Sequence, residues 1–271
     1  MEVLHACCCG LDVHKESVTA CVLWAEGRGK KRKEKRQFGT MTQDLLALAD
    51  WLRACGVTHV AMESTGVYWK PVWNILEGQC EILLVNAQHI KSVPGRKTHQ
   101  NDAEWIANLL QHGLLRGSFV TPTPIRELRD LMRYRVSLAQ ECNRIANRIQ
   151  KVLEDGNIKL ASVATDALGA SGRAMLKAMI EGEEDVERLA ERSRGLLRRK
   201  IPELRRALEG RLRSHHRFLL KELMEHLEFV ESKMARLERE IGEHLRPFEE
   251  EVQRLCTSHC LPCRGPSQSL L

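Results

Sequence analysis

The sequence lacks any apolar run of the roughly 18 residues that a membrane-spanning helix needs, so we expect no membrane span. It also lacks a basic stretch followed by an apolar one in its first residues, MEVLHACCCG, and secretion is therefore not expected. Aromatic residues make up only 4% of the 271 residues, whereas 43% are hydrophobic and 29% are charged. This balance is typical of a soluble globular chain with long helices.

A disulfide framework is also missing, although the chain has ten cysteines. Three of them are consecutive at positions 7–9 and cannot pair sensibly with one another. Four more lie in apolar stretches, where a free thiol packs as a small hydrophobic group: Cys21, Cys55, Cys80 and Cys142. This usage predicts a reducing, cytoplasmic location.

Positive charge is concentrated in two places, although the net charge is only +6. Residues 28–36 (RGKKRKEKR) hold seven basic side chains in nine positions, and we expect them to form a loop. A second basic stretch, from Arg188 to Arg217, is rich in arginine, whose guanidinium group meets phosphate in a two-pronged contact. Two interpretations stay open for each: nucleic-acid contact, or ordinary surface charge on a hairpin tip and on a salt-bridged helix face.

The first 120 residues alternate strand patterns with helix patterns. Strands are predicted at 8–12, 18–24, 57–62 and 82–86, with a turn at 14–17 and a further strand beginning in 36–39. Helices are predicted at 42–55, 68–77 and 103–112, the last closed by Gly113. The order predicts an α/β domain over residues 1–120, a mixed sheet with flanking helices.

Residues 121–255 have a helical pattern throughout. Apolar side chains at three- and four-residue spacings predict one long helix over 125–153 and another over 201–255, with shorter helices over 156–182. Pro247 should kink the second long helix, because proline donates no backbone hydrogen bond. An antiparallel hairpin of the two long helices and a dimeric coiled coil are both compatible with the pattern.

Residues 256–271 (CTSHCLPCRGPSQSLL) differ in composition from everything before them, and we expect a disordered tail. Four side chains of this tail are of types that bind zinc: Cys256, His259, Cys260 and Cys263. Their spacing is more compressed than that of a zinc finger, and no second ligand pair follows.

Three acidic residues carry the chemistry that the sequence predicts. Asp12 ends the first strand, Glu63 ends a later one, and Asp102 starts a helix with His99 one turn earlier. Each has a simpler interpretation, as a turn residue, a hydrogen bond at a helix start or an N-cap. Together they predict a site where carboxylates on rigid elements hold two Mg²⁺ ions for phosphoryl chemistry.

The segments around these acids resemble the DEDD-type transposases of the insertion-sequence-110 family. The similarity lies in GLDVHKESVTACVL, AMESTGVYWKPVWNILE, VNAQHIKSVPGRKTHQNDAEWIANLLQHGLLRGSFV and LRDLMRYR, and it continues to about Leu255. It implies an RNase H-like (RuvC-like) catalytic domain followed by a helical coiled-coil segment in a bacterial protein. It also implies divalent metal ligands at Asp12, Glu63 and Asp102, action on DNA at insertion-sequence ends and targets, and a structured guide RNA. A homo-oligomer through the coiled coil is a further expectation.

Two departures from the family pattern bear on activity. His99 stands where the family has its fourth acid, and a neutral imidazole ligand suits Mn²⁺ better than Mg²⁺. The family's C-terminal domain, with its serine nucleophile, is not found, and none of Ser258, Ser267 and Ser269 can be assigned that role. We therefore hypothesise a truncated or frameshifted copy, which the absence of a serine-domain reading frame in the downstream DNA would contradict.

Other residues near the acids are candidate nucleic-acid contacts: His14, Lys15, Arg96 and Lys97. Tyr68 and Trp69 could stack on a base, but their apolar neighbours favour a core or interface position. Two alternatives to an active transposase stay open. One is an inactive nucleic-acid-binding remnant. The other is a sugar-kinase-like ATPase, which the absence of glycine-rich phosphate loops disfavours.

Overall fold

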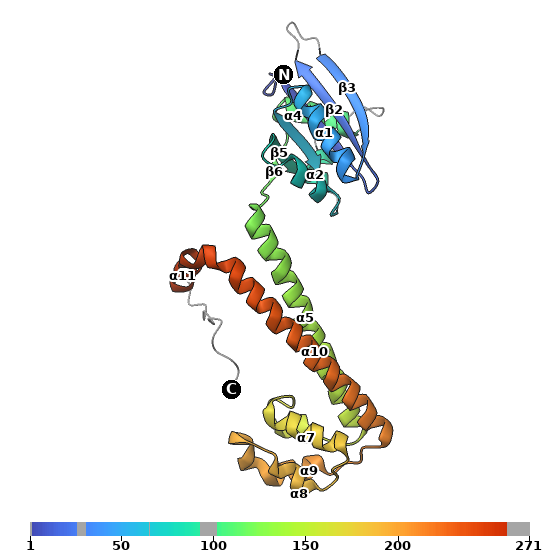
Figure 1. The fold of residues 1–271 in the computed structure, drawn as a ribbon, viewed down its shortest axis with the longest axis vertical. Coiled ribbons are helices and arrows are strands. Elements are labelled where there is room, and N and C mark those ends of the chain that lie inside the picture. The colour runs from blue at the N-terminus through green and yellow to red at the C-terminus, as the bar shows by residue number, and fades with distance from the viewer. Residues whose placement is uncertain (1, 26–30, 65, 93–101, 259–271) are drawn as a thin grey trace. The chain divides into compact units, whose positions relative to one another are not determined.

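The computed structural model describes residues 2–25, 31–64, 66–92 and 102–258. The chain divides into two compact units, Met1–Thr121 and Pro122–Leu271, which we call the N-terminal unit and the helical unit. Within the described ranges, all strands belong to the N-terminal unit (Figure 1). None of the described helices has the length and apolar character needed to cross a membrane.

A six-stranded sheet in the order β3-β2-β1-β4-β5-β6 forms the centre of the N-terminal unit. Its strands are β1 (Cys7–Val13), β2 (Ser17–Ala25), β3 (Lys31–Gly39), β4 (His59–Glu63), β5 (Glu81–Val85) and β6 (Gly117–Ser118). β1, β2 and β3 are antiparallel neighbours, β4 and β5 continue the sheet parallel to β1, and β6 is antiparallel to β5. This arrangement confirms the predicted mixed sheet.

Helices cover both faces of the sheet. They are α1 (Thr42–Ala54), α2 (Trp69–Leu76), α3 (Ala87–Ser92) and α4 (Asp102–Gln111). Alternate side chains of β1 belong to opposite faces: Leu11 packs in a core with α1 and α2, whereas Cys8 packs in a second core with α4. Gly10 and Asp12 alternate with Leu11 and so lie on the face that α4 covers. The acidic end of β1 is thus directed to α4.

Of the predicted loop, residues 28–30 lie outside the described residues, and the prediction is wrong for residues 31–35, which belong to β3 together with the strand expected at 36–39. Lysine and arginine are poor strand formers in a sheet interior, but β3 is an edge strand, where long charged side chains are tolerated. The Arg32 guanidinium lies 4.7 Å from the centre of the Trp24 ring, so part of this charge packs on an aromatic surface. The other predicted strands of this unit, and its predicted helices, lie within two residues of the observed ends.

Two long antiparallel helices form the axis of the helical unit, α5 (Thr123–Asp155) and α10 (Ser214–Leu245) (Figure 1). Arg135 in the first half of α5 pairs with Glu238 in the last third of α10, whereas Asp155 at the end of α5 pairs with His216 at the start of α10. Within the chain the structure has the antiparallel hairpin, and a dimeric coiled coil stays a prediction.

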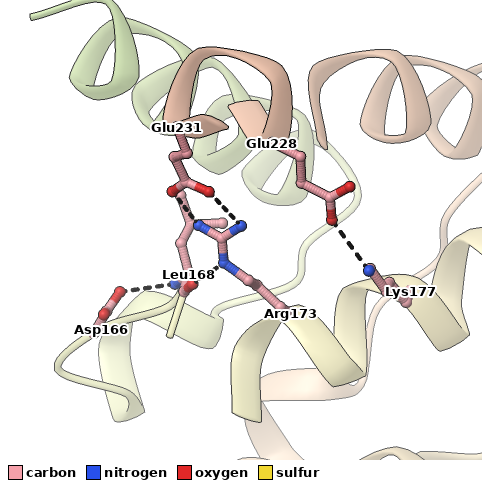
Figure 2. Close-up of polar contacts among 6 residues, drawn as sticks. All are labelled: Asp166, Leu168, Arg173, Lys177, Glu228 and Glu231. Atoms are coloured by element: carbon pink, nitrogen blue, oxygen red, sulfur yellow. Dashed lines mark hydrogen bonds and ion pairs between the residues drawn. The ribbon is translucent and has the colours of Figure 1, made fainter. Parts of the chain in front are cut away.

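Shorter helices connect α5 to α10. They are α6 (Leu160–Val163), α7 (Ala170–Glu181), α8 (Val186–Glu191), the 3-10 helix η2 (Gly195–Lys200) and α9 (Ile201–Leu208). Their apolar side chains share one core with α5 and α10. Figure 2 shows how α7 is joined to α10: Arg173 forms two parallel contacts with Glu231, and Lys177 pairs with Glu228.

The prediction of one helix over 201–255 is wrong, because α9 ends at Leu208 and α10 begins only at Ser214. Between them the chain passes close to the end of α5: the Arg211 amide donates to the Gly156 carbonyl oxygen over 2.8 Å. A Cβ atom at Gly210 would lie 2.5 Å from the same oxygen, so only glycine fits there without a shift.

The expected break at Pro247 is present. α10 ends at Leu245, the 3-10 helix η3 (Arg246–Phe248) contains the proline, and α11 (Glu249–Ser258) follows. Residues 256–258 are therefore helical rather than part of a disordered tail, a difference that composition did not predict.

Candidate metal centre

Asp12 and Glu63 lie on adjacent parallel strands, near the end of β1 and at the end of β4. The register pairs Gly10 with Ala61 and Leu11 with Met62, so the next step along both strands reaches the two acids. Residues at the same step of neighbouring strands share a face of the sheet. Both carboxylates therefore belong to the face covered by α4.

Asp102 is the first residue of α4, and Gly10 lets that helix approach the sheet. A Cβ atom at Gly10 would lie 2.2 Å from the Ala103 carbonyl oxygen and 2.4 Å from the Ala107 amide nitrogen. No side chain larger than hydrogen fits that space. Gly10 is two residues before Asp12 on β1, so this contact positions the start of α4 close to Asp12. Asp102, the third acid, therefore lies at the same end of the sheet as Asp12 and Glu63.

Asp102 and Glu63 both act electrostatically on Asp12. Burial raises the pKa of the Asp12 carboxyl above its ordinary value, the adjacent His14 lowers it, and the charges of Asp102 and Glu63 raise it. The His14 Nε2 atom lies 3.3 Å from Asp12 Oδ2, and the Asp12 side chain is only 19% exposed. A nearby negative charge disfavours the ionised form of a carboxyl group.

The donor set suits a hard divalent cation, because all three side chains offer carboxylate oxygens and a bound ion would offset their mutual repulsion. The oxygen atoms of the three acids do not all lie close enough together to form one ligand set, however. Among the described residues, the group whose ligating atoms all lie within 4.8 Å of one another is a different one, Asp155, His215 and His216. The three acids share one end of the sheet without yet forming complete coordination geometry.

The cluster at Asp155 is better explained as a hydrogen-bonded link between α5 and α10. His216 is 5% exposed, and its Nδ1 accepts the Arg213 backbone N–H over 3.2 Å. The ring proton is then on Nε2, which donates to Asp155 Oδ2 over 2.7 Å. Both ring nitrogens of His216 are used, so it has no lone pair left for a metal.

Several predicted site residues, His99, Arg96 and Lys97, lie outside the described residues. Lys15 is exposed in the turn between β1 and β2, where its carbonyl oxygen accepts the Thr40 hydroxyl over 3.0 Å. The described part of the chain therefore places His14 beside Asp12 and Lys15 in the adjoining turn, and the role predicted for Arg96 and Lys97 stays a prediction.

The tryptophan and tyrosine that begin α2 have different surroundings. Trp69 packs edge-on against Trp73, with ring centres 6.0 Å apart, and belongs to the core under α1 and α2. Tyr68 is 43% exposed. The core interpretation thus holds for Trp69.

Of the tail, His259, Cys260, Cys263, Ser267 and Ser269 lie outside the described residues, and the structure describes no side chain for Cys256 or Ser258.

Glu104 is part of the site's surroundings that sequence reasoning missed. Its carboxylate binds Lys33 Nζ at 2.9 Å and Lys35 Nζ at 2.6 Å, which joins α4 to the edge strand β3. The hydrogen bond from Lys35 is the largest influence lowering the Glu104 pKa. The signal was present in the sequence as an acid two residues after Asp102, but its partners are recognisable only once residues 31–36 are known to be a strand.

The strand order, the helix on the acidic face and the three carboxylates define an α/β protein with an acidic cluster at one end of a mixed sheet. A model of the DEDD transposase family of insertion sequence 110, described as a transposase, matches residues 9–158, more than half of the chain. The chain belongs to this family. No curated protein sequence matches it.

Two solved structures are similar to parts of the chain. The RuvC structure from Thermus thermophilus shares 14% identity over 41% of this chain and 99% of its own length, with a TM-score of 0.32. T. thermophilus RuvC in complex with a Holliday junction substrate shares 13% identity over 42% of this chain and 100% of its own length, with a TM-score of 0.33.

Proposed function

We propose that this transposase cleaves and transfers DNA strands in a reaction that needs Mg²⁺ or Mn²⁺, with Asp12, Glu63 and Asp102 as metal ligands. The observation that supports this most directly is the register of β1 and β4, which brings Asp12 and Glu63 to the end of the sheet where Asp102 begins α4. Three carboxylates held at one end of a sheet repel one another. A bound cation would offset this repulsion, and clusters of like charge of this kind are typical of functional sites.

Each residue has a part in holding the reacting phosphate group. Asp12 and Glu63 are held by paired strands and Asp102 by the first turn of α4, so the carboxylates keep a fixed orientation. His14 hydrogen-bonds Asp12 and restricts the rotation of its carboxylate. Divalent ions, when bound, supply electrostatic stabilisation of the charge that develops on the phosphoryl oxygens. His99, in the fourth ligand position, favours Mn²⁺.

The partners follow from the family. We propose insertion-sequence ends and target DNA as substrates, a structured guide RNA as a further partner, and His14, Lys15, Arg96 and Lys97 as contacts to the sugar–phosphate backbone. The expected place of action is the cytoplasm. We also propose a homo-oligomer formed through α5 and α10. Exposed apolar side chains on both helices support this: Met132, Val136, Phe218 and Phe229.

The proposal is tested by following cleavage of branched and duplex DNA by the full chain while Mg²⁺ or Mn²⁺ is titrated. Asp12→Asn should abolish the metal-dependent products. Asp50→Asn is the matched control, because it removes the same charge from an exposed acid of α1 that pairs only locally with Arg53. Product from Asp12→Asn at the wild-type rate would refute the assignment.

Metal binding is measured separately, so that an inactive chain can still be interpreted. An ion that binds only the folded state stabilises it by about 2.7 kcal/mol at 100 times its Kd, which appears as a rise in Tm. We expect this rise for the wild type and for Asp50→Asn, and its loss for Asp12→Asn. A metal-induced rise without cleavage would instead support the alternative, a nucleic-acid-binding remnant that has lost catalysis.

A further inference from the structure

Positive charge is concentrated in one stretch of the helical unit, residues 192–213, which we call the basic segment. It holds nine arginine and lysine side chains against two glutamates, and all eleven of these residues are exposed. It spans η2, α9 and the turn before α10. A net charge this high within 22 residues repels itself, so it needs an explanation beyond solubility.

The fold directs this charge outward. α9 buries Leu204, Ala207 and Leu208 in the core of the helical unit, which leaves Arg206 on the opposite side of the helix. Among the described residues, acidic side chains neutralise little of the charge: of the nine basic groups, only Arg205 forms an ion pair, with Glu187 of α8. The second basic stretch is therefore not a salt-bridged helix face over this segment.

Three of these cations follow one another in the last turn of η2, so their like charges repel one another. Arg198, Arg199 and Lys200 come directly before α9, whose N-terminus carries partial positive charge and has no side-chain cap. Acidic residues are preferred at such a position, and only Glu203 is found in the first turn of α9. An anion bound here would interact favourably both with the three side chains and with the helix end.

We propose that the basic segment binds the phosphate backbone of duplex DNA, at a surface separate from the metal centre. Residues 192–213 contain no aromatic side chain, so they lack the stacking groups with which proteins hold single-stranded bases. Arginine forks contact phosphates without reading sequence, which fits a surface that holds any duplex. The choice of DNA over duplex RNA rests on the proposed function; the phosphate binding does not.

The test uses the full chain in EDTA, so that metal-dependent chemistry is absent. Affinity for a short labelled duplex DNA is measured by fluorescence anisotropy at several salt concentrations. The test variant carries Arg198→Gln, Arg199→Gln and Arg206→Gln, three exposed side chains outside the core. The matched control carries Arg148→Gln, Arg236→Gln and Arg239→Gln, which remove the same charge from exposed positions on α5 and α10.

Each lost phosphate contact lowers the slope of log affinity against log salt by about 0.9, so the test variant should lose about two to three units of slope and about tenfold in affinity. The control should retain the wild-type slope. Equal losses in both variants would show a mere effect of net charge and overturn the proposal. Tighter binding of duplex RNA or single strands, lost in the test variant, would overturn the choice of duplex DNA.

The proposed function can fail without this inference failing. Asp12→Asn should bind duplex DNA in EDTA as the wild type does, whether or not the chain cleaves DNA. Circular dichroism of all variants checks that the helical unit is intact. A test variant with wild-type helicity and wild-type DNA affinity would refute the role of the basic segment.

Discussion

Gly10 of β1 lies directly against the carbonyl of Ala103 in α4, so closely that a Cβ atom at Gly10 would come within 2.2 Å of the carbonyl oxygen. The contact sets the distance between the sheet and the helix that carries Asp102. It therefore links the packing of the N-terminal unit to the position of one of the three acids.

Gly10→Ala should destabilise the N-terminal unit by about 1–3 kcal/mol, because the added methyl group must push α4 away from β1. The displaced helix moves Asp102, so the metal-induced rise in Tm should be lost as well. All five tryptophans lie in the N-terminal unit, so tryptophan fluorescence reports the unfolding of this unit alone.

Gly117→Ala is the control for this substitution. A Cβ atom at Gly117 meets only the Leu83 side chain, at an ordinary contact distance of 3.6 Å or more. Its stability and metal response should remain close to those of the wild type. If Gly10→Ala unfolds and responds to metal as Gly117→Ala does, the close approach does not position Asp102.

The stability of the same unit should depend on pH through His5. Its ring stacks on His59, with ring centres 3.8 Å apart, and burial together with the charge of His59 lowers the pKa of His5 below its ordinary value of 6.5. Glu81, which pairs with His59, acts in the opposite direction. The folded state therefore favours the neutral imidazole of His5.

As the pH falls through about 6.5, the unfolded chain binds a proton at His5 before the folded chain does, so the free energy of unfolding should decrease. The decrease is complete once the pH is below the lowered pKa of the folded state. Tryptophan-detected urea unfolding between pH 8 and pH 5, at about half-unit steps, measures it. His5→Asn should flatten this part of the profile, and an unchanged slope in that variant would assign the effect to another group.

Much of the N-terminal unit was predictable because its signals are local. Alternation along β1 and β4 placed Asp12 and Glu63 at strand ends, and the apolar spacing of α4 placed Asp102 at a helix start. Two features were not local. The strand at 31–36 depends on Trp24, Trp51 and Glu104 as partners for its charges, and the break at Gly210 depends on the chain passing Gly156. Neither the partners of residues 31–36 nor the approach of Gly210 to Gly156 can be recognised from the neighbouring sequence alone.

Three of the four cysteines in the sheet should be unreactive in the folded protein. Cys8, Cys9 and Cys21 are fully buried, burial raises the pKa of Cys9, and burial together with Glu104 raises the pKa of Cys21 to about 11. The reactive thiolate form is therefore scarce at pH 8. Iodoacetamide labelling of the native chain, read by mass spectrometry, should leave these three unmodified, whereas labelling in denaturant should modify all ten. Native labelling of Cys21 would show that the sheet opens on the labelling timescale.

Arg173 of α7 and Glu231 of α10 form an ion pair, in which the guanidinium and the carboxylate meet through two N–H···O contacts of 3.0 and 2.5 Å (Figure 2). Arg173 also donates from Nε to the Leu168 carbonyl oxygen over 2.6 Å, so the guanidinium is held from both sides. A double-mutant cycle with Arg173→Gln and Glu231→Gln should give a coupling of about 1–2 kcal/mol, because paired charge-assisted hydrogen bonds are partly shielded from water.

The neighbouring pair of Lys177 and Glu228 provides the internal comparison. It joins the same two helices through one 3.1 Å contact, but its side chains are 60% and 46% exposed. Its cycle should give less than about 0.5 kcal/mol, since solvent screens an exposed pair and two flexible side chains must be ordered. Amide hydrogen exchange of α7 in the full chain measures both cycles as local opening free energies. Equal couplings for the two pairs would mean that the fork geometry of Arg173 adds nothing to a simple attraction of opposite charges.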